Sequence, residues 1–446
     1  MKPYPKMKDS GVPWLGAVPE HWEVEFARWL FHRMDRPPKD ADEVVTCFRD
    51  GVVTLRRNRR VTGFTESLKE IGYQGIRRGD LVIHAMDAFA GAIGVSDSDG
   101  KGSPVYSVCQ PRPRASANYF ALLLREMARS GWIEAQAKGI RERSTDFRFA
   151  DFAAQPVPVP TIEEQESIVR FLDYADRQIG RDIRAKQKLI KLLEEQKQAI
   201  IHQSVSLGID PNVRLKPSGV EWLGDIPEHW EVKRLKWATR LQRGYDLPAD
   251  RRIPGPYPVV SSGGLIGSHV EARAKAPGVA IGRYGSTEAV FFLERDYWPH
   301  NTSLFVTDFQ GNYARWAYYM LRTISKADHS GKSAVPGVDR KDLFDIRIPV
   351  PSPAEQTQIA RHADEMCEQV DGAISAARNE IVLLRELGVR LISEVTTGHL
   401  DVREAVVNYP KANYGDPLTN EVTDAGQGLV VSRRSDSGAI LGPSEA

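Results

Sequence analysis

The chain has 446 residues, which is more than one hydrophobic core usually organises, so two or more domains are expected. Its net charge is +1, with 41% hydrophobic and 27% charged residues, which excludes a global basic field and leaves only local surfaces for nucleic acid. The three cysteines form no CxxC pair, and there is neither a signal-peptide core nor a run of about eighteen apolar residues, so a soluble cytoplasmic protein without a membrane partner is expected.

The first predicted element is a fifteen-residue segment that recurs almost unchanged 208 positions later. Latch 1, as we call Ser10–Val24, reads SGVPWLGAVPEHWEV, and latch 2, Ser218–Val232, reads SGVEWLGDIPEHWEV. Repetition at this distance predicts a duplicated architecture. The latch residues expected to be large buried anchors and fixed turns are Trp14, Pro19, Trp222 and Pro227, and those expected to begin a domain's first strand are Trp22 and Trp230. Duplication of His21 and His229 favours a structural over a catalytic role for these histidines.

Latch 1 opens a first domain, residues 1–155, whose pattern is mixed α/β: the apolar run DLVIHAM predicts a strand and NYFALLLREMARSG a helix. Clustered arginines in a near-neutral chain are candidates for phosphate and guanine contacts, because the guanidinium fork fits both. A solvated hairpin or loop is the alternative reading for each. The candidates in this domain are Arg56, Arg57, Arg59 and Arg60, which we call the arginine knot, with Arg77, Arg78, Arg141 and Arg143.

Residues 156–208 are predicted to form a long helix. Thr161 and Glu164 fit the capping box in which a hydroxyl and a carboxylate cap the first turn reciprocally. Taking Ile162 as heptad position a, eight of the twelve a and d positions up to Ile200 are apolar, which favours a coiled coil over two independent surface helices. Gly208 is the predicted stop.

The second half repeats this order. Residues 209–347 contain latch 2 and a second mixed α/β domain with no convincing alignment to the first, and residues 348–400 contain a second helix in the same heptad register. That helix is expected to start at Ser352, with Pro353 in its first turn, and to stop near Gly398. The candidate DNA contacts here, in two loops, are Arg283, Tyr284, Ser286, Lys332 and Ser333. Residues 401–446 are expected to be a disordered tail.

Catalytic and cofactor motifs are missing from the sequence. It has no N-P-P-Y/F or D-P-P-Y motif, no G-x-G-x-x-G loop and no complete phosphate loop around Gly331, and the ten histidines form no ligand cluster. No catalytic residue, metal or cofactor is therefore assigned to the chain itself.

The duplicated latch, the proline-rich entries ending in Glu-Gln at Pro158–Gln165 and Pro349–Gln356, and two long helices alternating with divergent domains occur together over Lys8 to about Val402. In this combination the chain resembles the specificity subunit of a type I restriction–modification enzyme. The resemblance implies a mixed α/β (α+β) fold with two target recognition domains. They are separated by two long helices that form an antiparallel coiled coil, within a pseudo-twofold internal repeat.

In that family each recognition domain reads one half of a bipartite double-stranded DNA site, and the specificity subunit has no active site. Two methyltransferase (modification) subunits bind to it and carry S-adenosylmethionine, and motor-nuclease (restriction) subunits bring ATP and Mg. The resemblance thus implies a non-catalytic part of an adenine-specific DNA methyltransferase and type I site-specific deoxyribonuclease in phage defence. The alternative is a coiled-coil DNA-binding scaffold or regulator that acts without methyltransferase partners.

Overall fold

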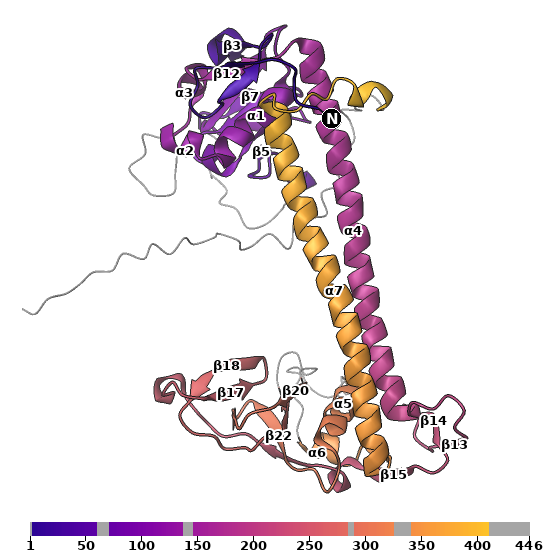
Figure 1. Cartoon of the computed structure of the whole chain (residues 1–446). Coiled ribbons are helices and arrows are strands. Elements are labelled where there is room, and N and C mark those ends of the chain that lie inside the picture. Colours follow the sequence, from indigo (N-terminus) through magenta and orange to yellow (C-terminus); the bar gives the residue numbers. More distant parts are fainter. Residues whose placement is uncertain (1, 60–70, 137–145, 284–289, 325–339, 410–446) are drawn as a thin grey trace, which may run out of the picture. The chain divides into compact units, whose positions relative to one another are not determined.

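The computed structural model describes residues 2–59, 71–136, 146–283, 290–324 and 340–409 (Figure 1). It divides into two compact units, each considered by itself. Unit 1 comprises residues 1–179 and 386–446, and unit 2 comprises residues 180–385. Among the described residues, no helix contains an apolar stretch that could cross a bilayer.

Unit 1 is built on a four-stranded antiparallel sheet in the order β4-β11-β8-β9, against which helix α1 packs. Smaller pairs surround it: β1-β2 within latch 1, β3-β12, β5-β6 and β7-β10. The strands of unit 1 are β1 (Met7–Asp9), β2 (Ala17–Pro19), β3 (Glu23–Phe26), β4 (Phe31–Arg33), β5 (Val45–Cys47), β6 (Val53–Leu55), β7 (Gln74–Ile76), β8 (Leu81–His84), β9 (Ile93–Val95), β10 (Gly100–Gly102), β11 (Tyr106–Pro111) and β12 (Pro156–Val159). Its helices before the long one are α1 (Ala117–Arg129), α2 (Trp132–Gln136) and α3 (Phe149–Ala153), with 3-10 turns η1 (Ala27–Trp29), η2 (Arg56–Asn58) and η3 (Ala88–Ala90).

Unit 2 has a four-stranded antiparallel sheet of the same order, β16-β22-β19-β20, with helix α5 packed on it. The pairs β13-β14 and β15-β23 match β1-β2 and β3-β12, and unit 2 also has a three-stranded sheet in the order β18-β17-β21. The strands are β13 (Leu215–Pro217), β14 (Asp225–Pro227), β15 (Glu231–Arg234), β16 (Arg240–Arg243), β17 (Tyr257–Ser261), β18 (Gly264–His269), β19 (Gly278–Gly282), β20 (Val290–Leu293), β21 (Trp298–Pro299), β22 (Ser303–Asp308) and β23 (Arg347–Val350). The short helices are α5 (Ala314–Ile324) and α6 (Arg340–Phe344), with 3-10 turns η4 (Leu235–Trp237) and η5 (Ala249–Arg251).

The strand predicted from DLVIHAM and the helix predicted from NYFALLLREMARSG are confirmed as β8 and α1. Alignment of the two halves of the sequence did not reveal that both domains also share their order of strands and helices. Strands β8, β9 and β11 and helix α1 begin 197 positions before β19, β20, β22 and α5, respectively. The two domains therefore differ in sequence but share one sheet topology.

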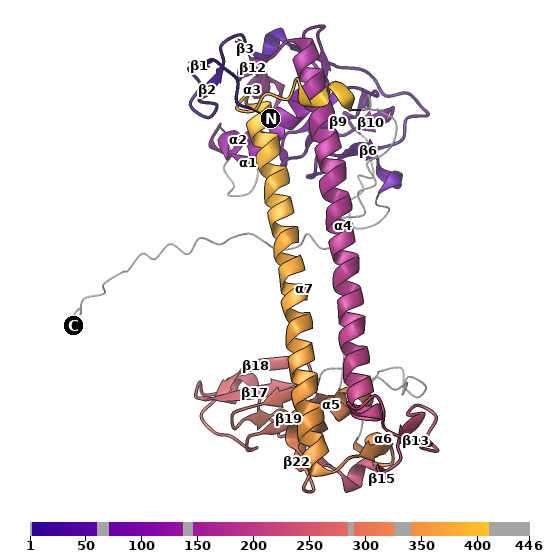
Figure 2. The same ribbon diagram turned by 45° about the vertical axis from the view of Figure 1, so that its right-hand side comes forward.

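The two long helices are α4 (Ile162–Leu207) and α7 (Pro353–Thr396), of 46 and 44 residues. Within unit 2, Lys186 pairs with Glu380 and Lys197 with Asp371, so residue numbers rise along α4 while those of their partners fall along α7. The helices are therefore antiparallel there, and Figure 2 shows them side by side. These ion pairs are partly exposed, so the helix pairing depends mainly on its apolar seam.

The seam lies where the heptads place it. On α7, seven predicted a and d residues are buried and two more, Leu384 and Leu391, are half-buried. The seven are Ala360, Ala363, Cys367, Val370, Ile374, Ala377 and Ile381. On α4, Val169, Leu172 and Ile183 are buried, while Asp176 at an a position is exposed. Apolar side chains spaced three and four apart thus form a stripe along α7, and one along α4 that is interrupted by Asp176, Lys186 and Lys197.

The end of the described chain differs from the predicted tail. Residues 401–409 pack onto unit 1: Val402 and Val406 are buried in its core, and the ring of Tyr409 stacks on Tyr174 at 4.1 Å. The last turn η6 spans Ala405–Asn408. These apolar side chains stand in a segment whose composition is otherwise polar, which is why the sequence analysis assigned them to the tail; residues 410–446 lie outside the described part.

Candidate nucleic-acid interface

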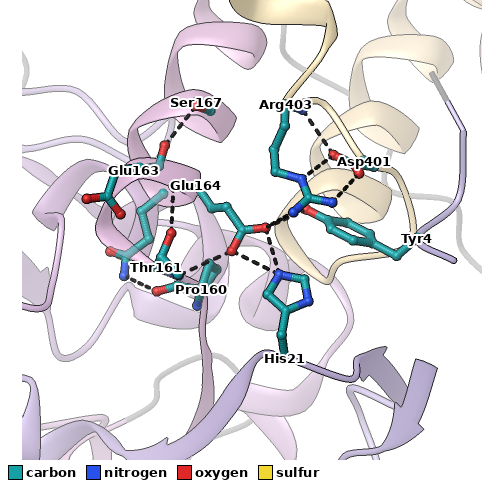
Figure 3. Close-up of polar contacts among 10 residues, drawn as sticks. Tyr4, His21, Pro160, Thr161, Glu163, Glu164, Ser167, Asp401 and Arg403 are labelled. Atoms are coloured by element: carbon teal, nitrogen blue, oxygen red, sulfur yellow. Dashed lines mark hydrogen bonds and ion pairs between the residues drawn. The ribbon is translucent and has the colours of Figure 1, made fainter. Parts of the chain in front are cut away.

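The start of α4 is fixed by a carboxylate that serves both the helix and latch 1. The predicted capping box is confirmed: Glu164 N donates to Thr161 Oγ1, and Thr161 N donates to Glu164 Oε2, both at 3.3 Å. The same buried carboxylate lies 2.9 Å from His21 Nε2 and 3.6 Å from Arg403 Nη1, and it accepts a bond from Tyr4 OH (Figure 3). One side chain therefore joins latch 1, the start of α4 and the segment after α7.

The start of α7 repeats this arrangement. Glu355 N donates to Ser352 Oγ at 3.3 Å, and Pro353 occupies the first helical position as predicted. The Glu355 carboxylate lies 2.6 Å from His229 Nε2 and accepts a bond from Trp230 Nε1 at 3.2 Å. His21 and His229 thus have equivalent contacts, which agrees with the structural role inferred from their duplication.

The glutamine after each glutamate connects the long helix to its domain. Gln165 is fully buried; its amide nitrogen donates to the carbonyls of Pro160 and Arg114, and its oxygen accepts from the amide of Ser116, the N-cap of α1. Gln356 does the same in unit 2, accepting from the amide of Tyr313 directly before α5. The heptad pattern placed Gln165 in the seam, whereas its role is to bond two helix starts together.

The end of the other long helix meets each latch tryptophan. Gly398 and Gly208 have φ of +81° and +78°, as the predicted helix stops require. A β-carbon at Gly398 would lie 2.8 Å from Trp22, and one at Gly208 would lie 3.3 Å from Trp230. Each latch therefore binds the start of one long helix and the end of the other, which explains why the same segment occurs twice.

Pro19 and Pro227 are buried as predicted, but the buried tryptophans of the latches are not the predicted ones. Trp22 and Trp230 are 0% and 2% exposed, whereas Trp14 and Trp222 are only half-buried. The prediction failed because contact with the helix ends, which the sequence does not reveal, decides which tryptophan is covered. Strands β3 and β15 begin one residue after Trp22 and Trp230, close to the predicted place.

The pH dependence of unit 2 follows from Glu355. Burial works against its ionisation, but hydrogen bonds from His229, Ser352 and Trp230 outweigh burial and lower its pKa from 4.5 to about 2. A carboxyl with a lowered folded-state pKa stabilises the fold above its unfolded pKa, and this contribution is lost as the pH falls from 4.5 towards about 2. We expect E355Q to cost about 1–2 kcal/mol at neutral pH and almost nothing near pH 2. Thermal unfolding of wild type and E355Q across this range checks it; a constant difference between them would contradict the assignment.

The described candidate arginines of unit 1 include one cluster, which contains Arg57 and Arg77, and others that lie outside it. Arg57 Nη1 lies 2.5 Å from Glu43, and Arg77 Nη1 lies 3.1 Å from the adjacent Asp42, so the structure brings the arginine knot and the second arginine pair together. Arg59 lies outside this cluster. Its guanidinium group pairs with Asp50 and lies over the ring of Phe48. Carboxylates thus balance three of the candidate guanidinium groups.

Two further candidates in unit 1 have different contacts. Arg78 is exposed, and its Nε donates to the carbonyl of Asp97 at 2.8 Å, while its backbone amide donates to Asp99 Oδ1 at 2.9 Å. Arg56 Nε donates to Thr46 Oγ1 at 3.3 Å. The remaining candidates of this unit lie outside the described residues: Arg60, Arg141 and Arg143.

In unit 2 the structure places one predicted residue and adds one that the sequence reading missed. Arg283 follows β19, and its Nη1 donates to the carbonyl of Asn301 at 3.3 Å. Arg243, at the end of β16, donates from Nε to the same carbonyl at 3.1 Å. Two guanidinium groups therefore meet at one turn, a fitting site for a phosphate. The predicted Tyr284, Ser286, Lys332 and Ser333 lie outside the described residues.

The sequence could have indicated that Arg243 and Arg283 meet only through the internal repeat. Arg243 and Arg283 are 40 positions apart, but each directly ends or follows a strand of the duplicated sheet, so knowledge of the shared topology would have placed both at one edge. Within the described residues no group of three or more His, Cys, Asp and Glu side chains is arranged to hold a metal.

The arginine knot gives a quantitative prediction. Replacing its four arginines by glutamine should weaken DNA binding and reduce the log–log salt slope by about 0.9 for every phosphate that is no longer neutralised. If the first domain reads one half-site, as the family resemblance implies, only that half-site should lose base discrimination. Titrations of the assembled complex on DNA at several salt concentrations measure this. Arg148→Gln, at an exposed arginine paired with Asp146, is the matched control; an unchanged slope in the knot variant would move the DNA surface elsewhere.

Comparison with known proteins identifies the proteins to which this chain is similar. No protein-family model matches the chain. The MjaVIII type I restriction enzyme specificity subunit of Methanocaldococcus jannaschii is 29% identical over 126 residues, 28% of this chain and about a quarter (27%) of that protein's length. A second protein of that organism, inferred to be the MjaX type I restriction enzyme specificity subunit, is 21% identical over 434 residues, covering 87% of this chain and 96% of its own.

Solved structures agree in fold. One chain, from work on complex assembly and conformational transition of the type I R-M system, is 16% identical, with a TM-score of 0.64 over 86% of this chain and 99% of that one. The HsdS subunit of Thermoanaerobacter tengcongensis is 17% identical, with a TM-score of 0.52 over 86% of this chain and 98% of its own. The fold is a mixed helix and strand fold of the HsdS kind, and the resemblance to type I restriction–modification specificity subunits is confirmed.

Proposed function

We propose that this chain is the DNA-specificity subunit of a type I restriction–modification complex and that it recognises a bipartite, asymmetric site. The observation that carries the proposal is the duplicated frame: two units with one sheet topology, each attached by a latch to both long helices. Residues 1–155 and 209–347 are the two target recognition domains, each reading one half-site, and residues 156–208 and 348–400 are the spacer helices, paired as a coiled coil.

Different half-sites require different surfaces, and the two domains have them. The described arginines of the first domain are mostly held by carboxylates, whereas Arg243 and Arg283 of the second are held by the carbonyl of Asn301. The second domain has the three-stranded sheet β18-β17-β21, where the described part of the first has the pairs β5-β6 and β7-β10. A shared topology with unlike surfaces suits two readers of unlike sequences.

The spacer helices also offer surface for partners. Besides the seam, α4 exposes Leu189 and Leu192, and α7 exposes Val382 and Leu383, all within unit 2 and between 42% and 62% exposed. Exposed apolar side chains on a pair of helices are typical of a surface that binds another protein. We assign it to the modification subunits, with the motor-nuclease subunits joining the assembled complex.

The experiment that tests the proposal separates specificity from catalysis. The purified chain alone, supplied with S-adenosylmethionine, is expected to bind DNA weakly and transfer no methyl group, since its role requires no active site. Adding the modification subunit encoded with it should produce sequence-specific adenine methylation. Methyl transfer by the chain alone would contradict the proposal. DNA binding that is unaffected by modification subunits would instead favour the scaffold or regulator.

A further inference from the structure

Two tryptophans stand out by their exposure. All nine tryptophans of the chain lie among the described residues, and only Trp29 and Trp237 are exposed, at 63% and 65%. The others are buried or half-buried. An indole carries one of the largest apolar surfaces of any side chain, so leaving two of them in water indicates a surface that another molecule covers.

The two exposed tryptophans occupy equivalent positions in the repeat. They are 208 positions apart, the same separation as the latches, and they end the equivalent 3-10 turns η1 and η4. A cation precedes each: Arg28 Cζ lies 5.7 Å from the centre of the Trp29 ring and 4.5 Å from that of Phe26, and Lys236 Nζ lies 5.9 Å from that of Trp237 and 3.3 Å from Asp345 Oδ1. The same pair of groups is therefore presented once by each unit.

Their immediate neighbours have changed between the copies. Phe26 in unit 1 corresponds to Arg234 in unit 2, and the residue after the tryptophan is Leu30 in one copy and Ala238 in the other. The fold does not require an indole here, because the buried anchors of the latches are Trp22 and Trp230. What the two copies share at this place is an exposed indole with a cation beside it.

An exposed indole with a cation beside it occurs in both units, and this recurrence limits the kind of molecule that can bind there. The candidate DNA surfaces of the units differ in the partners of their arginines, as reading of different half-sites requires. A feature that recurs in both units is expected to bind the same partner twice. An indole reaches the face of a base in duplex DNA only if a base step is unstacked, and base stacking on aromatic side chains is typical of single strands. Tryptophan and arginine are, in contrast, the residues on which protein–protein interfaces most often depend.

We propose that Trp29 with Arg28, and Trp237 with Lys236, are the anchors on which two copies of one partner protein bind, one on each unit. The partner presents an apolar pocket for the indole with a carboxylate at its rim, which pairs with Arg28 on unit 1 and on unit 2 competes with Asp345 for Lys236. The inference rests on the proposed function, which supplies the modification subunit as a protein present in two copies.

The test uses the full-length chain assembled with its modification subunit, and native mass spectrometry counts the subunits over a dilution series. The wild type should bind two copies. W29A and W237A should each retain one copy at full affinity and hold the other at least about 30-fold more weakly, and the double variant should lose both. R28E and K236E should have the same effects, since they place like charges opposite the expected carboxylate. Controls are Ile71→Ala and Leu265→Ala, at side chains 77% and 66% exposed without a repeat partner, which should bind two copies normally.

Three results would overturn the inference, and they are distinguishable. Two copies bound with wild-type affinity by the double tryptophan variant would show that the partner binds elsewhere. Loss of DNA binding by the variants in the absence of modification subunits, with unchanged copy number, would assign the indoles to DNA. Failure of the wild-type chain to bind any modification subunit would contradict the proposed function itself and this inference with it.

Discussion

Replacing Trp22 by alanine is expected to destabilise unit 1 by about 3–5 kcal/mol, because it removes a large, fully buried side chain from a junction of three elements. The indole packs edge-on against Tyr4 at 5.8 Å and covers Gly398 at the end of α7. Without it, the end of α7 and the segment after it are no longer held against latch 1. The cavity cannot be filled by a small shift, because the latch strands β1 and β2 are themselves paired.

The chain carries its own control for this experiment. Trp29→Ala makes the same chemical change seven residues away at an exposed position, and we expect it to change stability by no more than about 0.5 kcal/mol. Trp230→Ala and Trp237→Ala form the equivalent pair in unit 2. Hydrogen exchange in α1 and in α5 reports the two units separately. Equal decreases in protection in W22A and W29A would show that the latch tryptophan is not a structural anchor.

Lengthening both long helices by one heptad is expected to lengthen the gap between the two half-sites while leaving the half-sites unchanged. Seven residues, inserted after seam residues Ile190 in α4 and Ala377 in α7, are two helical turns, so the apolar stripe keeps its register. They add about 10 Å of helix. At about 3.4 Å per base pair, this corresponds to about three additional base pairs of gap.

Methylation of a DNA library with varied gap lengths by the assembled complex measures this shift. The same heptad inserted in α4 alone is the control, because it offsets one helix against the other and should disrupt their pairing and the activity. A stable, active double-insertion variant that prefers the original gap would show that the helices do not set the spacing.

Sequence patterns predicted the starts and ends of the long helices and their apolar seam well, because each of these features depends on residues that are close together in the sequence. The capping boxes at Thr161–Glu164 and Ser352–Glu355 need residues only three positions apart, and the heptads need only a regular apolar spacing. The helix-ending glycines are equally local, since φ near +80° at Gly208 and Gly398 is a property of one residue.

Contacts between distant segments escaped the sequence analysis. Nothing near Trp22 in the chain indicates that it meets Gly398, and no periodicity distinguishes the hydrogen-bonded Gln165 from a seam residue. The shared topology of the two domains was also missed, although one signal existed. A strand and a helix begin 36 positions apart in each domain, at Leu81 and Ala117 and again at Gly278 and Ala314.

The candidate DNA contacts were the least predictable part. Arginine clustering drew attention to Arg57 and Arg59, yet each has a carboxylate partner that offsets its charge. Arg243 stood in no cluster, but the sheet brings it to the same carbonyl as Arg283. The charge available to a phosphate depends on the partner of each guanidinium group, which only the folded chain determines.

The most direct test of the proposed two-domain DNA specificity is a base-resolution map of adenine methylation made by this chain with its modification subunit on random-sequence DNA. We predict a single asymmetric motif with two specific half-sites separated by a gap of constant length and unspecified sequence. Methylation confined to one continuous motif, or methylation with no sequence preference, would contradict it.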